Sequence, residues 1–225
     1  MTMFKVAQCW DDGVVSDIII TDLCRKYGAK ATFNLNPGLN PEKVRGNVWM
    51  HQGFPVVKLA KSEMRSVYQG FRVASHNMTH AECDRVTEEE FLKEALDARK
   101  FCEDLLQHEA RGFAWPCGRY TQSLADRMRE AGFVYGRTTK NVLQVMPPEH
   151  PMIFHSSCHF RNENFMEILE RSKEFGVFYF WGHSYELHDD PARIADLEAK
   201  YAAINAVEGV QWVDVADLFG GNGGE

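Results

Sequence analysis

Two adjacent carboxylates, Asp11 and Asp12, follow a short apolar run at residues 4–10 and precede Gly13. Like charges placed side by side raise each other's pKa unless a cation lies near them. Such a pair suits a site in which one carboxylate binds a metal ion and the other acts as a base. The same residues are also common in a solvated turn between a strand and a helix, so the pair alone leaves both interpretations open.

Two histidine pairs have a spacing of four residues, His76/His80 and His155/His159. This spacing places both imidazoles on one side of the chain if the residues between them form a helical turn. The first pair follows an apolar run directly, whereas the second falls inside an apparent strand. Two histidines and one carboxylate leave coordination positions open, as in catalytic zinc sites. His76 and His80 are therefore the candidate metal ligands, and a hydrogen-bonded structural role is the alternative for either pair.

Short apolar runs alternate with segments of helical periodicity along most of the chain. The expected strands are residues 4–10, 31–36, 71–75, 112–115, 134–139, 152–160, 177–181 and 210–213. The expected helices are residues 16–27, 62–70, 87–107, 121–131, 162–175 and a last helix that starts at Asp190 and Pro191. Residues 48–59 are expected to form a small hairpin around Gly53. The alternation predicts a parallel α/β sheet, and seven or eight such units indicate a barrel.

Several polar segments come just after the apolar part of an expected strand. They are Asp11-Asp12, His76/His80, Pro116-Cys117-Gly118 and His183. In an α/β barrel these positions converge on one face, where active sites are built. A metal ion there would lower the pKa of its water to about 7. A carboxylate could then take the proton, and a histidine across the site could protonate the leaving group.

The composition of the 225 residues, 44% hydrophobic and 25% charged, indicates one globular domain with a sizeable core. The net charge of −7 and the lack of a Lys/Arg-rich run argue against a nucleic-acid partner. We expect no membrane partner, because no apolar run is long enough to span a bilayer and the N-terminus lacks a signal-peptide core. The six cysteines lack C-x-x-C spacing, which predicts reduced thiols and a cytoplasmic location. A chain trimmed of its export signal would look the same.

Four motifs, taken together and in chain order, resemble the polysaccharide deacetylase family, carbohydrate esterase family 4. Members of this family remove acetyl groups from chitin, peptidoglycan, xylan and related molecules. The family's T-F-D-D-G motif is matched by Cys9-Trp10-Asp11-Asp12-Gly13, and its H-[ST]-x-x-H motif by His76-Asn77-Met78-Thr79-His80. The R-P-P-x-G motif is partly matched by Ala114-Trp115-Pro116-Cys117-Gly118, and L-x-x-H is approximated by Phe180-Trp181-Gly182-His183. The resemblance covers residues 9–183.

The resemblance implies a distorted (β/α) barrel in a single catalytic domain, residues 1–219. The Gly-rich composition of residues 220–225 predicts a flexible tail. The resemblance also implies Asp11 as the general base and His183 as the general acid. It also implies one divalent metal ion, zinc in the first place with cobalt or nickel as alternatives, held by Asp12, His76 and His80. Substrate contacts are expected from Trp115, Pro116, Cys117 and His159, and the implied partner is an acetylated sugar or oligosaccharide.

The chain departs from the family pattern at two supporting positions. Ala114 stands where the family has the arginine that orients the catalytic aspartate. Arg72, Arg111 or Arg119 could supply that charge, and the spacing does not choose among them. The family's tryptophan-and-aspartate motif, which supports the acid histidine, has no match in residues 155–161.

Three residues near these motifs have two readings each. His159 enters the pocket in place of the missing motif, or it is a strand residue, which is the favoured alternative. For Glu186 a solvated loop charge is favoured over a catalytic role. For Cys117 a buried small residue is favoured over a reactive thiol, because the sequence places no base beside it.

The leading hypothesis is a metal-dependent hydrolase that removes N- or O-linked acetyl groups from a carbohydrate or a small amino sugar. The bond cleaved would be a non-peptide C–N amide or an ester. The missing arginine and the predicted cytoplasmic location favour a small or soluble substrate over a long insoluble polymer. One alternative is a metal-free cyclic amidase of the same fold, and another is a non-catalytic carbohydrate-binding protein. The complete set of aspartates and histidines argues against both.

Overall fold

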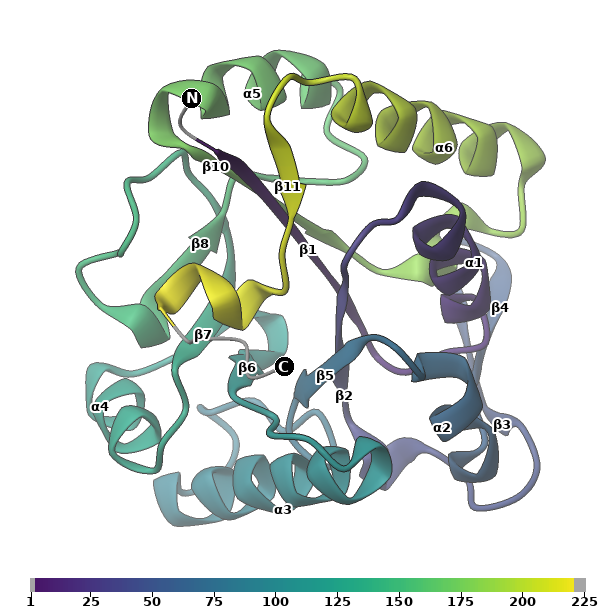
Figure 1. Ribbon diagram of the computed structural model, residues 1–225. Helices are drawn as coiled ribbons and strands as arrows, with labels where there is room; N and C mark the ends of the chain where they lie inside the picture. The colour runs from purple at the N-terminus through teal and green to yellow at the C-terminus, as the bar shows by residue number, and fades with distance from the viewer. Residues whose placement is uncertain (1–2, 221–225) are drawn as a thin grey trace.

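Parallel strands and the helices between them make up most of residues 3–220, the part of the chain that this computed structural model describes (Figure 1). The strands are β1 (Phe4–Asp11), β2 (Thr32–Leu35), β3 (Gly46–His51), β4 (Phe54–Lys58), β5 (Arg72–Ser75), β6 (Gly112–Ala114), β7 (Tyr135–Asn141), β8 (Phe154–Ser156), β9 (Cys158–His159), β10 (Val177–Gly182) and β11 (Val210–Trp212). The helices are α1 (Asp17–Tyr27), α2 (Lys61–Tyr68), α3 (Glu88–Leu106), α4 (Gln122–Glu130), α5 (Phe165–Ser172) and α6 (Pro191–Asn205). The predicted α/β alternation is confirmed.

Eight parallel strands of the described chain form a nearly closed barrel in the order β8-β7-β6-β5-β2-β1-β10-β9, and β11 pairs with β1 beside them. The two ends of this order are consecutive in the chain and are joined by Ser157. The Ser157 backbone N–H donates to the Tyr179 carbonyl at 2.6 Å, and its Oγ accepts from the Tyr179 N–H at 3.0 Å. One bent segment therefore pairs with β7 on one side and β10 on the other, which closes the barrel.

The strand expected at residues 152–160 is not continuous. The chain forms a short 3₁₀ turn at Pro151–Ile153 and then the two strands β8 and β9. The break follows from the closure of the barrel, because the segment changes its strand partner between Ser156 and Cys158.

Side chains alternate along the strands, so every second residue points into the barrel. One interior cluster contains Cys9, Tyr135, Phe154 and Tyr179, and Val215 packs against it from the chain after β11. Two residues beyond Cys9 and Tyr135 come Asp11 and Arg137, both buried. The same alternation therefore delivers polar side chains to the carboxyl-terminal end of the barrel.

The helices cover the outside of the barrel (Figure 1). A large cluster of buried side chains joins the outer faces of β1, β2 and β10 to α1, α2, α5 and α6, and a second one joins β6 to α3 and α4. Within residues 3–220, no helix has both the length and the apolar character that crossing a bilayer requires. Of the predicted tail, residues 221–225 lie outside the described residues.

The predicted hairpin is confirmed as the antiparallel pair β3–β4, which is separate from the barrel. The end of β4 pairs with the residues that follow the two aspartates. Lys58 forms an antiparallel β-bridge with Val14, and the Leu59 N–H donates to the Gly13 carbonyl at 3.2 Å. The hairpin therefore stands at the carboxyl-terminal end of β1, next to the predicted site.

Candidate active site

A cavity of about 620 Å³ opens at the carboxyl-terminal ends of the barrel strands. The predicted residues that line it are Asp11, Asp12, His76, His80, Trp115, Cys117 and His183. The segments that the sequence separates by more than 170 residues thus meet at one face, as the barrel prediction requires.

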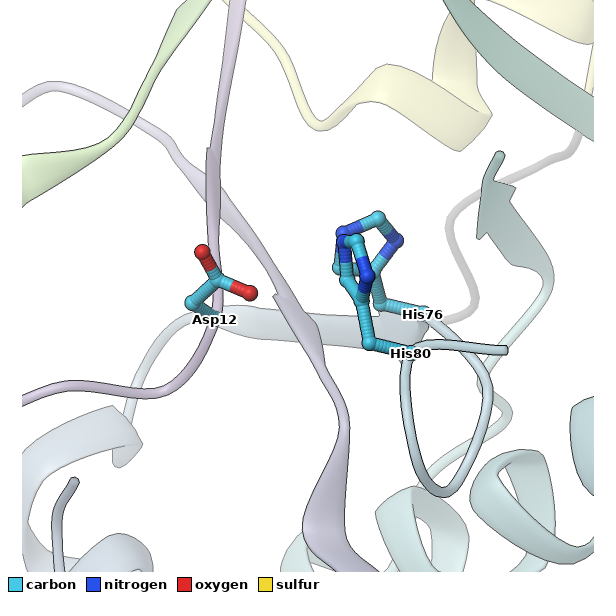
Figure 2. A group of neighbouring side chains, drawn as sticks. All are labelled: Asp12, His76 and His80. Atoms are coloured by element: carbon cyan, nitrogen blue, oxygen red, sulfur yellow. The ribbon is translucent and has the colours of Figure 1, made fainter. Parts of the chain in front are cut away.

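Asp12, His76 and His80 form a compact group of potential metal ligands in this cavity. One ligand atom from each lies within 4.8 Å of the others, and the carboxylate faces the two imidazoles (Figure 2). The imidazole rings meet edge to face with centroids 4.6 Å apart. The residues between them do not form a helical turn: Asn77 and His80 have positive φ angles of 59° each, so an irregular loop brings the rings together.

The hydrogen bonds of His76 suit a metal ligand. Its Nδ1 lies 2.8 Å from the carbonyl oxygen of Ala114. A carbonyl only accepts, so Nδ1 carries the hydrogen and Nε2 keeps its lone pair. Burial lowers the pKa of His76 to about 4, so the ring is neutral at pH 7. Two imidazoles and one carboxylate are a donor set that fits a divalent ion such as zinc.

Asp12 is held in an unusual backbone conformation, with φ at 89°. Its Oδ1 accepts from the amide of Asn36 at 2.8 Å, and the ammonium of Lys58 lies 3.9 Å away. Lys58 also donates to the backbone carbonyl of Asp12 and to Asn36 Oδ1. Burial opposes ionisation, but Lys58 and the histidines hold the pKa of Asp12 below its usual value. The solvated-turn alternative is wrong, because Asp12 is only 8% exposed.

Glycine at position 38 supports the loop that carries the two histidines. The Gly38 N–H donates to the Met78 carbonyl at 2.8 Å. A Cβ at this position would lie 2.6 Å from the same oxygen. The close backbone approach therefore requires glycine here.

Asp11 and His183 face each other beside this group. His183 Nε2 and His76 Nε2 each lie 3.9 Å from Asp11 Oδ2. Asp11 Oδ1 accepts from the amide of Asn34 at 2.7 Å. Burial opposes ionisation of Asp11, but Arg137 and the two histidines hold its pKa well below its usual range. The ionised carboxylate of Asp11 and the imidazole of His183 therefore face each other within the cavity.

Residues 2–136 match the family model described as polysaccharide deacetylase, which is more than half of the chain. The chain belongs to the polysaccharide deacetylase family. The resemblance read from the four motifs is therefore confirmed. Among curated proteins, none matches this sequence significantly.

Solved structures of the same fold support the barrel. One is a putative polysaccharide deacetylase from Mycobacterium smegmatis, with a TM-score of 0.68 and 14% identity over 97% of this chain and 91% of that one. Another is a family 4 acetyl xylan esterase from Clostridium thermocellum in complex with a cobalt ion, with a TM-score of 0.59 and 15% identity over 96% and 90%. Peptidoglycan deacetylase PdaC from Bacillus subtilis has a TM-score of 0.55 and 16% identity over 96% and 90%. At these identities the likeness concerns the fold.

The charge that this deacetylase lacks at Ala114 comes from the neighbouring strand. Arg137 on β7 is the register partner of Ala114 on β6. Its Nη2 donates to Asp11 Oδ2 inside the barrel, and its guanidinium lies 4.5 Å from the centroid of the Trp181 ring. Arg137 is 1% exposed, so solvent screens its charge little and the interaction with Asp11 is strong.

The prediction that Arg72, Arg111 or Arg119 supplies the charge beside Asp11 is wrong. Arg72 and Arg111 line a cavity at the amino-terminal end of the strands, where Arg72 pairs with Asp214 at 3.7 Å. Arg119 is about half exposed and pairs with Glu82 and Asp84. Strand direction explains the error for Arg72 and Arg111, because residues at the start of β5 and β6 lie at the far end of the barrel.

Glu186 supplies a carboxylate beside the histidine expected to act as the acid. It follows β10 in a 3₁₀ turn, Ser184–Leu187, and its Oε2 lies 3.5 Å from His183 Nδ1 and 2.9 Å from His159 Nε2. Burial would lower the pKa of His183, but Glu186, Asp11 and Asp12 outweigh it, so the pKa is raised. The interpretation of Glu186 as a solvated loop charge is wrong, since its side chain is 13% exposed.

His159 is the last residue of β9, as the strand alternative expects. Its ring packs edge to face on Trp181 and lies 6.4 Å from the ring of His183, centroid to centroid. It is not one of the residues that line the main cavity. His159 is therefore connected to His183 through the carboxylate of Glu186. The other histidine of its pair, His155, forms a hydrogen bond of 2.6 Å with Thr138 Oγ1.

The third motif forms the floor and rim of the cavity. Trp115 is fully buried and donates from Nε1 to the Met152 carbonyl at 2.7 Å. Pro116 is buried and is not among the lining residues, whereas Cys117 lines the cavity with a positive φ of 53°. The expectation of a buried Cys117 is wrong, because this residue is exposed at the cavity rim.

A buried hydrogen-bond cluster fixes the loop that carries His183. Asp17 at the start of α1 accepts from the hydroxyls of Ser184 and Tyr68, the latter at 2.6 Å, and from the Val14 N–H at 3.3 Å. The residue that follows His183 is thereby tied to both α1 and α2.

Sequence reasoning missed Asn34, Asn36, Lys58, Arg137 and Asp17 as members of the site and its support. A signal exists for the first four, since each is a polar residue within or directly after a predicted strand or hairpin, where apolar residues dominate. Which of them point inward depends on strand register, which the local pattern leaves open.

Proposed function

We propose that this chain is a metal-dependent hydrolase that removes acetyl groups, N- or O-linked, from a carbohydrate or a small amino sugar. Membership of the polysaccharide deacetylase family and the likeness to the acetyl xylan esterase and PdaC folds support deacetylation of a sugar. One observation carries the metal-dependent chemistry: the donors of Asp12, His76 and His80 converge within 4.8 Å, beside an Asp11 carboxylate that faces His183.

Asp12, His76 and His80 would hold the metal ion. Zinc is our first choice, with cobalt or nickel as alternatives, because imidazole nitrogens and one carboxylate suit these ions. When bound, such an ion supplies Lewis-acid polarisation of the acetyl carbonyl and makes a water molecule more acidic.

Asp11 would act as the general base. The ion pair with Arg137 and the amide of Asn34 keep it ionised and fix its orientation. In the attack, a C–O bond forms between water and the acetyl carbon as the carbonyl π pair moves onto its oxygen, and one water proton moves to Asp11 Oδ2. The C=O bond forms again when the leaving group departs.

His183 would act as the general acid. It donates its Nε2 proton to the leaving nitrogen or oxygen as the bond from that atom to the acetyl carbon breaks, which gives acetate and the free amine or hydroxyl. Glu186 faces Nδ1 and stabilises the protonated ring before the transfer. Trp115 and Cys117 would shape the pocket around the acetyl group.

Metal analysis of the purified protein beside two variants tests this proposal. We expect close to one divalent ion per chain, loss of that ion in Asp12→Ala, and acetate release from acetylated sugars by the loaded wild type. Asp11→Asn should keep the ion and lose turnover. A wild type that binds no ion, even after zinc or cobalt is added, would refute the proposal and leave the metal-free amidase or the binding protein.

A further inference from the structure

One wall of the cavity is built outside the barrel. Asn47, Trp49 and Lys58 line it from the hairpin β3–β4, and Tyr185 lines it from the turn after β10. These two segments are more than 120 residues apart in the sequence, so the wall exists only because they pack on each other.

Aromatic rings join the two segments. Trp49 and His51 both contact the ring of Tyr185, with centroids 5.6 and 5.0 Å apart. Further along, Phe54 stacks on His188 at 4.3 Å. Rings at these separations are in van der Waals contact, so a sugar chain has no passage between the hairpin and the turn at this place.

The wall is anchored on both sides. Asn47 donates its amide to the Leu39 carbonyl at 2.8 Å, and Arg45 forms a bidentate ion pair with Glu63 on α2. On its other strand, Lys58 forms a β-bridge with Val14, two residues after Asp12. These contacts attach the hairpin to α2 and to the chain after β1.

The position of the wall relative to His183 decides its effect on the substrate. The ring of Tyr185 lies 5.0 Å from that of His183, centroid to centroid. In the proposed function His183 faces the leaving group, which is the sugar atom that carried the acetyl group. The sugar would then lie near Tyr185 and Trp49, which both line the cavity and are partly exposed, and aromatic rings of this kind can pack on a sugar ring.

We propose that this aromatic wall makes the site a pocket for a terminal sugar, so that the enzyme deacetylates single sugars and the end units of short oligosaccharides rather than units inside a long polymer. This inference rests on the proposed function and names its substrate class. Trp49 and Tyr185 are the residues that impose the limit.

Acetate release from N-acetylglucosamine oligomers and from O-acetylated xylose oligomers, each of one to six units, tests the inference with the metal-loaded enzyme. We expect kcat/KM to level off by the second unit, and mass spectrometry to find the lost acetyl group at a chain end. A kcat/KM that keeps rising with length, or loss of internal acetyl groups, would overturn the pocket and leave the deacetylase function intact. No acetate from any oligomer would overturn the proposed function itself.

Trp49→Ala opens the wall, and Met50→Ala is its matched control. Met50 is the next residue of β3, 63% exposed and outside the cavity lining. We expect Trp49→Ala to raise kcat/KM for the six-unit oligomer relative to the two-unit one by about tenfold, and Met50→Ala to leave this ratio unchanged. An unchanged ratio in a folded Trp49→Ala protein would contradict the role of the wall.

Discussion

The guanidinium of Arg137 pairs with the carboxylate of Asp11 inside the barrel, where both side chains are almost fully buried. Its strand partner is Ala114, the position where the family motif has an arginine. The paired residues of adjacent strands project to the same side of the sheet. The Arg137 side chain therefore points to the side of the sheet to which an arginine at position 114 would point.

Replacing Arg137 with Met leaves the Asp11 carboxylate buried without its cation. Breaking a buried ion pair costs about 3–5 kcal/mol of stability. The pKa of Asp11 should rise, and turnover near neutral pH should fall by about 100-fold or more. Urea unfolding and acetate release measure the two effects.

Two further variants check this interpretation of Arg137. Adding Ala114→Arg to the Arg137→Met protein should recover part of the lost turnover, because the new guanidinium starts from the paired position. Arg119→Met, which removes a half-exposed arginine, should change turnover less than about twofold. If Arg137→Met kept full turnover, Arg137 would not control the base.

Replacing Glu186 with Gln should change the pH dependence of the reaction. Glu186 helps to raise the pKa of His183, so the protonated acid form persists to higher pH in the wild type. Activity that depends on this form is present below the His183 pKa and is lost as the pH rises through it. The basic limb of the kcat/KM profile should therefore move to lower pH in Glu186→Gln, with a loss of roughly tenfold at pH 7.5.

Glu186→Asp is the conservative counterpart for this experiment. A carboxylate on a shorter side chain should restore part of the shift in the basic limb, whereas a purely structural role would move activity without moving the limb. A basic limb that is identical in all three proteins would show that Glu186 does not act on His183.

Adding a methyl group at Gly38 should weaken metal binding at a distance from the ligands. The new Cβ would lie 2.6 Å from the Met78 carbonyl, in the middle of the loop between His76 and His80. The loop must move, so we expect about a tenfold loss of affinity for zinc and a stability loss of about 1–3 kcal/mol. Titration calorimetry with zinc measures the first effect.

Gly46→Ala is the control for Gly38→Ala. Its nearest neighbour would be Pro41 Cγ at an ordinary 3.5 Å, so affinity and stability should stay close to those of the wild type. Equal zinc affinity in both variants would mean that Gly38 does not support the metal loop.

Replacing Asp17 with Ala should destabilise the fold. The hydroxyls of Tyr68 and Ser184 would each lose a buried acceptor, which costs about 2–4 kcal/mol in total. Urea unfolding at pH 7 checks this value. Asp22→Ala on the same helix removes an exposed carboxylate and should change the unfolding free energy by less than about 0.5 kcal/mol.

Much of the site could be predicted from the sequence because its principal residues directly follow apolar runs. Asp11, His76 and His183 each end such a run, and the rule that strand ends converge in a barrel was enough to bring them together. Their supporting residues could not be assigned in this way. Arg137 reaches Asp11 only through the register of β6 with β7, and Glu186 reaches His183 only through the shape of one turn. Register and turn geometry depend on long-range packing, which local periodicity does not contain.

The bend at Ser157 has a consequence for motion. Strands β8 and β9, on either side of it, span three and two residues, so few ladder hydrogen bonds hold this junction of the described barrel. Short segments with few backbone hydrogen bonds open locally at a lower free energy than the core strands. An opening here would carry His159 away from Glu186 and loosen the environment of His183 while β1 and β2 stay paired. The ion pair that supports His183 is thus linked to a junction of two short strands in the barrel.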